Sequence, residues 1–196
     1  MIRRLLRTPV TWIVLAVLAA AGGFGLYWFQ PWKLVVDERV DETLSAPLAP
    51  SPAGSPSAPA GRSATAGPSA TAGPPAPAGP TVVVEGEFLS HEHETTGSAR
   101  IVRQPDGSHQ LELLDLSTSN GPDLRVWLTD QPVIEGRDGW HVFDDGAWVE
   151  LDVLKGNQGN QVYDIPAEVD PGDYTSVSIW CKRFSVSFGA APLDTG

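Results

Sequence analysis

Three patterns of apolar and polar residues follow one another along the chain. Residues 10–29 carry no charge, residues 45–80 are almost entirely Pro, Ala, Ser, Gly and Thr, and residues 81–196 mix short apolar runs with turn residues. Twenty apolar residues form a helix of about 30 Å, which matches the hydrocarbon core of a bilayer. The patterns predict a transmembrane helix at 10–29, a disordered linker at 45–80 and a folded domain at 81–196.

The apolar runs of the domain have the length and spacing of β-strands. They are rich in Val, Leu, Ile, Phe and Trp, and none keeps a 3.6-residue period for three turns. The expected strands are 82–88, 98–103, 109–116, 123–129, 140–143, 147–154, 161–165, 174–181 and 184–188. The fold class is therefore all-β, an antiparallel β-sandwich or flattened barrel, and strand spacing does not choose between the two.

The phase of the apolar positions changes between the last two expected strands. Val177, Ile179 and Cys181 have odd numbers, whereas the apolar positions that follow, Phe184, Val186 and Phe188, have even numbers. Because side chains alternate between the two faces of a strand, a bulge or tight bend must lie at Lys182-Arg183. Cys181 then ends an inward-facing row, just before this distortion.

The charges that flank the apolar run predict its orientation. Arg3, Arg4 and Arg7 precede it, and the acidic residues Asp37, Glu38, Asp41 and Glu42 follow it. By the positive-inside rule, residues 1–9 are cytoplasmic, whereas the juxtamembrane segment 30–44 and the β domain are extracytoplasmic. The chain is then a single-pass protein of the cell membrane. A cleaved signal peptide, ending near Ala19-Ala20-Ala21, is the alternative.

The linker is interpreted from its composition alone. A chain rich in Pro and Ala is a semi-rigid spacer, which would carry the domain away from the membrane, or a tether without a specific role.

The charge of the domain excludes one class of partner. Residues 81–196 contain 20 Asp and Glu against 7 Lys and Arg, a balance of -13. Such a domain repels phosphate backbones, so nucleic acid is not an expected partner. No serine-nucleophile motif, phosphate-binding loop or paired acid and base is found, which favours a redox or binding module over a stand-alone enzyme.

Five motifs together resemble the DM-thirteen domain family of extracytoplasmic and extracellular proteins. They are GEF (86–88), HETTG (93–97), NGPDLRVWL (120–128), LKGNQGNQVYDIP (154–166) and YTSVSIWCKRFSVSFGAAPL (174–193). The resemblance implies a β-strand-rich electron-transfer domain whose cysteine acts as a bare thiol or as a ligand for a prosthetic group such as haem. The matching residues are Cys181 and, for the family's histidine, His93, with His91 as an additional neighbour.

The residues themselves leave the role of Cys181 open. It is the only cysteine, so it forms no internal disulfide, and it is a redox thiol, a ligand or a small buried hydrophobe. Of its neighbours Lys182 and Arg183, at most one could stabilise a thiolate, because adjacent strand residues face opposite ways. Any haem would be non-covalent, because there is no C-x-x-C-H motif.

The histidines and amides have less distinctive patterns. His91 and His93 would share one face if they lay on a strand, but no further Cys or His stands at ligand spacing, so no metal site is assigned. Solvated loop histidines are the simpler interpretation. Asp123 and the GNQGNQ run are interpreted as turn residues, with a polar ligand as the alternative.

The leading hypothesis is an extracytoplasmic redox module in which Cys181 is active, His93 is its companion and a redox partner protein is required. The alternative is a non-enzymatic cell-surface binding domain with a structural cysteine.

Overall fold

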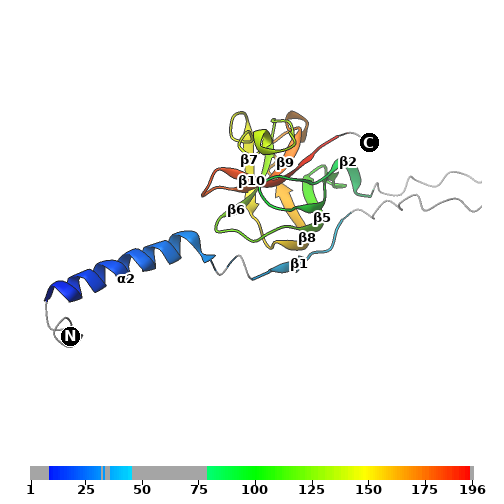
Figure 1. The fold of residues 1–196 in the computed structure, drawn as a ribbon. Coiled ribbons are helices and arrows are strands. Elements are labelled where there is room, and N and C mark those ends of the chain that lie inside the picture. Colours follow the sequence, from blue (N-terminus) through cyan, green and yellow to red (C-terminus); the bar gives the residue numbers. More distant parts are fainter. Residues whose placement is uncertain (1–8, 32, 34–35, 46–78, 195–196) are drawn as a thin grey trace, which may run out of the picture.

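The computed structural model describes residues 9–31, 33, 36–45 and 79–194. Helix α2 (Pro9–Phe29) projects from a β domain (Figure 1). Among the described helices, α2 alone is long and apolar enough to cross a membrane, and a signal sequence near the N-terminus also meets this criterion of length and composition. Most of the expected cytoplasmic segment 1–9 and of the linker 45–80 lies outside the described residues.

Ten described strands form two five-stranded sheets, which confirms the all-β sandwich. They are β1 (Arg39–Asp41), β2 (Thr81–Glu87), β3 (Leu89–Ser90), β4 (Thr96–Arg103), β5 (His109–Ser117), β6 (Leu124–Thr129), β7 (Trp148–Val153), β8 (Gln158–Ile165), β9 (Ser176–Cys181) and β10 (Val186–Pro192). The strand order is β1-β8-β5-β4-β2 in one sheet, called sheet A here, and β3-β10-β9-β6-β7 in the other, sheet B.

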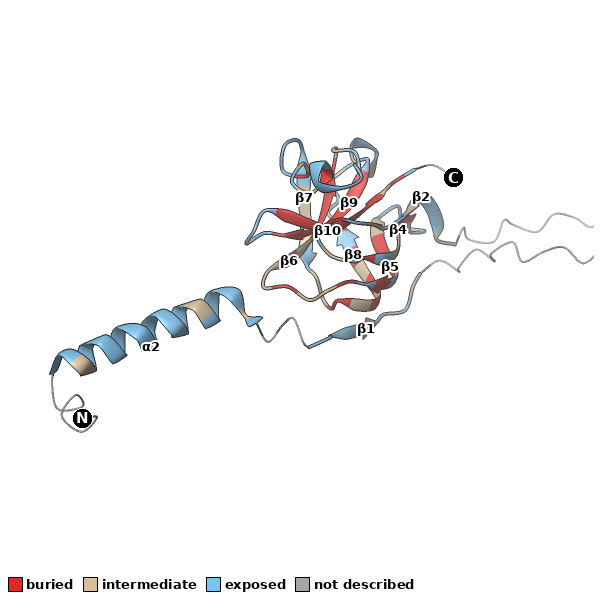
Figure 2. Cartoon of the chain, viewed as in Figure 1, coloured by how far each residue is buried: buried red, intermediate tan, exposed pale blue. Residues whose placement is uncertain are grey.

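The main core lies between the two sheets. Alternate residues of β4 and β5, such as Ile101 and Leu111, meet alternate residues of β6 and β9, such as Val126 and Ile179, and all four are fully buried. The buried strands form the centre of the domain in Figure 2. The period of two that is visible in the sequence therefore selects the side chains that fill the core.

A second apolar cluster covers the outer face of sheet B. It contains Trp127, Phe143, Trp180 and Ala190. The expected strand 140–143 is wrong: these residues belong to the connection between β6 and β7, which includes the 3₁₀ helix η2 (Arg137–Gly139). Closely spaced turns before and after residues 140–143 leave no room for a strand. Phe143 is nevertheless buried, because it packs on the outer face of sheet B.

An ion pair is buried on the outer face of sheet A. Arg100 Nη2 lies 2.7 Å from Glu112 Oε2, and neither side chain exposes more than 4 % of its surface. The backbone N–H of Ser45 donates to Glu112 Oε1 at 2.6 Å, and the Ser45 hydroxyl donates to the same oxygen. Burial alone would raise the pKa of Glu112, but the hydrogen bonds from Ser45 and Arg100 outweigh it and lower the pKa.

The juxtamembrane segment belongs to the folded domain, although the sequence placed it outside. β1 pairs in parallel with β8, with Arg39 opposite Gln158 and Asp41 opposite Asn160. Glu42 then accepts hydrogen bonds from Lys155 Nζ at 2.9 Å and from the Val162 N–H at 2.7 Å. Residues 36–45 thus supply the edge strand of sheet A.

The GNQGNQ run makes this pairing possible. The Asn157 side chain accepts from the Glu38 N–H at 2.7 Å and donates to Asp37 Oδ1 at 2.8 Å. A Cβ on Gly156 would lie 2.4 Å from the Glu38 carbonyl oxygen, and a Cβ on Gly159 would lie 2.1 Å from that of Val40. The interpretation as simple turn residues is therefore incomplete, because the run binds the chain's own N-terminal segment.

The described residues on both sides of the linker lie at one end of the sandwich. Gln104 Nε2 donates to Ser45 Oγ at 2.8 Å, and Thr81 pairs with Arg103, the residue before Gln104. Both are therefore close to the β4–β5 turn at residues 104–108. The sequence placed the linker between the anchor and the domain, whereas β1 joins the domain before residue 45, so that segment 46–78 connects two parts of the domain.

Substitution of Gly159 tests the docking of β1. Gly159→Ala should lower the free energy of unfolding of the full chain by about 2–3 kcal/mol, since it combines an unfavourable φ of +98° with a clash against β1. Gly107→Ala is the matched control, because its φ is +91° but no atom lies within 4 Å. It should cost about 1 kcal/mol. Equal losses in thermal or denaturant unfolding would contradict the docking.

Candidate functional site

Cys181 is the last residue of β9 and has no exposed surface. It pairs with Leu124 of β6 on one side and with Val186 of β10 on the other, and its side chain belongs to the main core. Burial raises the pKa of the thiol. At neutral pH Cys181 is therefore a protonated thiol enclosed by the core.

The turn after Cys181 explains the change of phase. Residues 182–185 form the tight turn of the β9–β10 hairpin, and Ser185 takes a φ of 49°. The predicted bend at Lys182-Arg183 is confirmed. The expected strand 184–188 is wrong at its start, because β10 begins at Val186, and Phe184 is 45 % exposed in the turn rather than facing the core.

Backbone amides of this turn oppose the effect of burial on the thiol. The N–H groups of Phe184 and Arg183, together with that of Asp123 from the connection before β6, act on the sulfur and lower its pKa. They do not outweigh burial. The sequence could not have predicted that these N–H groups lower the pKa of Cys181, because every non-proline residue has a backbone N–H group whatever its side chain.

The two cations next to Cys181 interact with groups other than its thiol. Lys182 Nζ lies 3.1 Å from Glu150 Oε2, and the Arg183 guanidinium lies 5.1 Å from the centre of the Trp28 ring in α2. The expectation that at most one of them could stabilise a thiolate is consistent with this arrangement. Their positive charges face the helix and the outer surface of sheet B.

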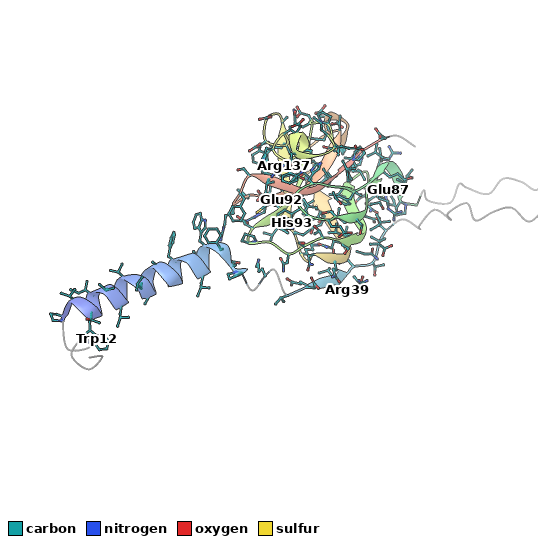
Figure 3. All side chains as sticks on the ribbon, viewed as in Figure 1. Trp12, Arg39, Glu87, Glu92, His93 and Arg137 are labelled. Carbon is teal, nitrogen blue, oxygen red and sulfur yellow. The ribbon has the colours of Figure 1, made fainter. Side chains whose placement is uncertain are left out.

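His93 lies near the same end of the sandwich but in a separate place. Residues 91–93 form a bend, and the His93 ring packs on Phe188 with a centroid distance of 3.9 Å. His93 Nε2 lies 3.2 Å from Glu92 Oε2, and Figure 3 labels both residues. Within the described residues no hydrogen bond joins this imidazole to the Cys181 thiol.

A cavity of about 190 Å³ opens beside His93. Its walls include Phe29 of α2, Pro122, Phe184 and Phe188, with Glu92 and His93 as the charged or titratable groups. Cys181 is not among the residues that line it. The cavity and the thiol are therefore separate features of this end of the domain.

His91 is buried, which corrects its interpretation as a solvated loop histidine. Its Nδ1 lies 2.9 Å from Ser187 Oγ, its Nε2 lies 3.2 Å from the Ile134 carbonyl oxygen, and its ring stacks on Phe143. Since the carbonyl only accepts, Nε2 carries the proton and Nδ1 accepts from Ser187. Ser178 Oγ in turn donates to Ser187 Oγ at 3.0 Å.

This chain of hydrogen bonds gives His91 a structural role. It joins the bend at 91–93 to the outer face of sheet B, and burial lowers the pKa of the imidazole, which keeps it neutral. His91 and His93 therefore do not share a face. The first packs on Phe143 at the outer face of sheet B, and the second lines the cavity.

A family model for the domain described as "Electron transfer DM13" matches residues 87–193, more than half of the 196 residues. The chain belongs to this family. No curated protein and no solved structure matches it. The match begins in β2, so the docked segment 36–45 lies outside the region that defines the DM13 domain.

Haem does not fit the DM13 domain in this conformation. A ligand atom must face an open coordination position, whereas Cys181 has no exposed surface. The cavity beside His93 is smaller than the roughly 300 Å³ at which sites for drug-sized ligands begin. The residues therefore support a thiol at Cys181 better than a haem ligand.

Burial of Cys181 predicts slow alkylation. In the native full chain, maleimide should label Cys181 on the order of 100-fold more slowly than in denaturant, because labelling requires local opening. Mass spectrometry of timed samples measures both rates. A Cys181→Ala, Ser108→Cys variant provides the exposed control and should react at the same rate in both states; equally fast labelling of native Cys181 would contradict its burial.

Lowering of the His91 pKa predicts loss of stability in mild acid. In the unfolded chain a histidine has a pKa of about 6.5. As the pH falls through this value, the unfolded state binds the proton before the folded state does, so the free energy of unfolding decreases. Thermal unfolding at pH 8 and pH 5.5 measures the change. His91→Gln should be less stable than the wild type at pH 8, and it should lose less stability than the wild type between pH 8 and pH 5.5. If both proteins lose the same stability, groups other than His91 cause the acid sensitivity.

Proposed function

We propose that this protein is a membrane-anchored, extracytoplasmic electron-transfer module whose redox activity depends on Cys181. Membership of the electron-transfer DM13 family carries the proposal, together with the presence of a single cysteine within the matched region. The apolar helix α2 supports anchoring. The basic residues before α2 and the acidic residues after it support an extracytoplasmic domain.

Burial defines how the thiol would act. An enclosed, protonated thiol is protected from random oxidation outside the cytoplasm, and it becomes reactive only when the turn at 182–185 opens. Once open, the thiol loses its proton to solvent and the sulfur attacks a disulfide of a redox partner. One new S–S bond forms, the partner's S–S bond breaks, and its second sulfur leaves as a thiolate.

A second function has specific support. The same complete burial suits a structural cysteine in a cell-surface binding domain, because an enclosed thiol among Leu124, Val186 and Ile179 packs as a small hydrophobic residue. In that case the cavity beside His93 or the exposed loops would bind the partner, and the thiol would take no part.

An equilibrium redox titration separates the two functions. Full-length protein in nanodiscs is incubated in thiol–disulfide buffers from about -320 to -120 mV, quenched in acid, denatured and alkylated. Electron transfer through Cys181 predicts a shift from reduced to mixed-disulfide form within this range. Incubation until equilibrium makes the oxidised fraction of Cys181 independent of how slowly the turn at 182–185 opens.

Two variants make the titration decisive. Cys181→Ala, Ser108→Cys carries an exposed thiol and should oxidise as an ordinary surface cysteine, whereas Cys181→Ala alone should give no signal. Retention of the wild-type unfolding temperature in Cys181→Ala would show that the fold is intact. If Cys181 stays reduced across the whole range while the thiol introduced by Ser108→Cys oxidises, the redox function is excluded and the binding domain is supported.

A further inference from the structure

The last turn of α2 contacts the turn that follows Cys181. The rings of Phe29 and Phe184 stack with centroids 6.2 Å apart. The Arg183 guanidinium lies over the Trp28 ring and donates to the Trp28 carbonyl oxygen. These contacts link the end of the anchor directly to residues 182–185.

The position of the end of α2 in a bilayer determines how deep the turn at 182–185 lies. α2 has 21 residues and a length of about 30 Å, so its two ends lie at the two surfaces of the hydrocarbon core. Tyr27, Trp28 and Phe29 form an aromatic group of the type that lies at headgroup level. Residues that contact this group, Arg183 and Phe184, must lie at the same level.

The charges at the turn suit a lipid surface. The domain has a balance of -13, yet two of its seven basic residues, Lys182 and Arg183, are adjacent here. Of the acidic groups nearby, Glu150 pairs with Lys182 and Arg125, Asp123 pairs with Arg125, and Glu92 faces His93. Lipid phosphates would attract the Arg183 guanidinium, which forms no ion pair with a carboxylate among the described residues, and the exposed Phe184 ring would enter the apolar boundary.

The connection between anchor and domain is compatible with this arrangement. Nine residues, 30–38, separate α2 from β1, and β1 is docked on β8. The β4–β5 turn at 104–108, beside which the residues flanking the linker lie, is at the other end of the strands from Cys181. The linker is therefore joined to the domain on the side away from α2.

We infer that residues 182–184 insert into the headgroup layer of the membrane that α2 spans, so that the Cys181 end of the domain faces the bilayer. This inference rests on the anchoring role of α2 proposed above. Its consequence is that a redox partner must reach Cys181 from the membrane, either as an integral membrane protein or as a lipid-soluble carrier. Partners free in the surrounding medium would meet the opposite end.

Spin labels on the full chain test this orientation. A nitroxide is attached to Phe184→Cys or Lys182→Cys in a Cys181→Ala background, and the protein is reconstituted into vesicles of mixed phosphatidylcholine and phosphatidylglycerol. Collisions with oxygen, which partitions into lipid, are compared with collisions with a water-soluble nickel chelate. The 184 label should collide several-fold less with the nickel chelate than a label at Ser108→Cys on the opposite turn.

Two controls separate this inference from the proposed anchoring. Carbonate extraction of the vesicles should leave every variant in the membrane fraction, and release would refute the anchor itself. If the protein stays anchored while labels at both 182 and 184 are as accessible to nickel as the label at 108, the orientation is wrong. The Lys182→Cys variant keeps the Phe184 ring, so its label reports the depth of the turn even if loss of that ring changes the depth in Phe184→Cys.

Discussion

The parallel pairing of β1 with β8 is the constraint on which the arrangement of this protein depends. It makes residues 36–45 part of sheet A and leaves only a short connection to α2. Ser45, at the end of the same segment, supplies hydrogen bonds that keep Glu112 ionised beside Arg100. A buried ion pair is costly unless each partner is fully hydrogen-bonded, so docking of the segment and stability of the sheet support each other.

The redox candidate lies next to the apolar helix α2. The turn at 182–185 contacts the end of α2 through Phe184, and this turn also closes the core over Cys181. A thiol at this position is shielded by its burial, and a partner in the membrane would reach it only through the opening of one turn. In the redox function proposed above, the same four residues would control both the shielding of the thiol and access to it.

His91 and His93 show how neighbouring residues acquire different roles. Ser187 and the Ile134 carbonyl group fix His91 as a neutral imidazole on the outer face of sheet B, whereas His93 packs on Phe188 and lines a cavity with Glu92. A bend replaces the strand on which both would have faced one way. The separation comes from the backbone, since two identical side chains two positions apart offer no pattern that distinguishes them.

The sequence by itself determined the apolar helix, the all-β class, most strands and the bend after Cys181, because these depend on the period and length of apolar runs. It also identified the family through motifs that span the domain. Only the tertiary structure decided that segment 36–45 docks on the domain through β1, that Phe184 faces outward and that His91 is buried. These features depend on contacts between distant segments, such as Asn157 with Glu38, and local periodicity carries no information about such contacts.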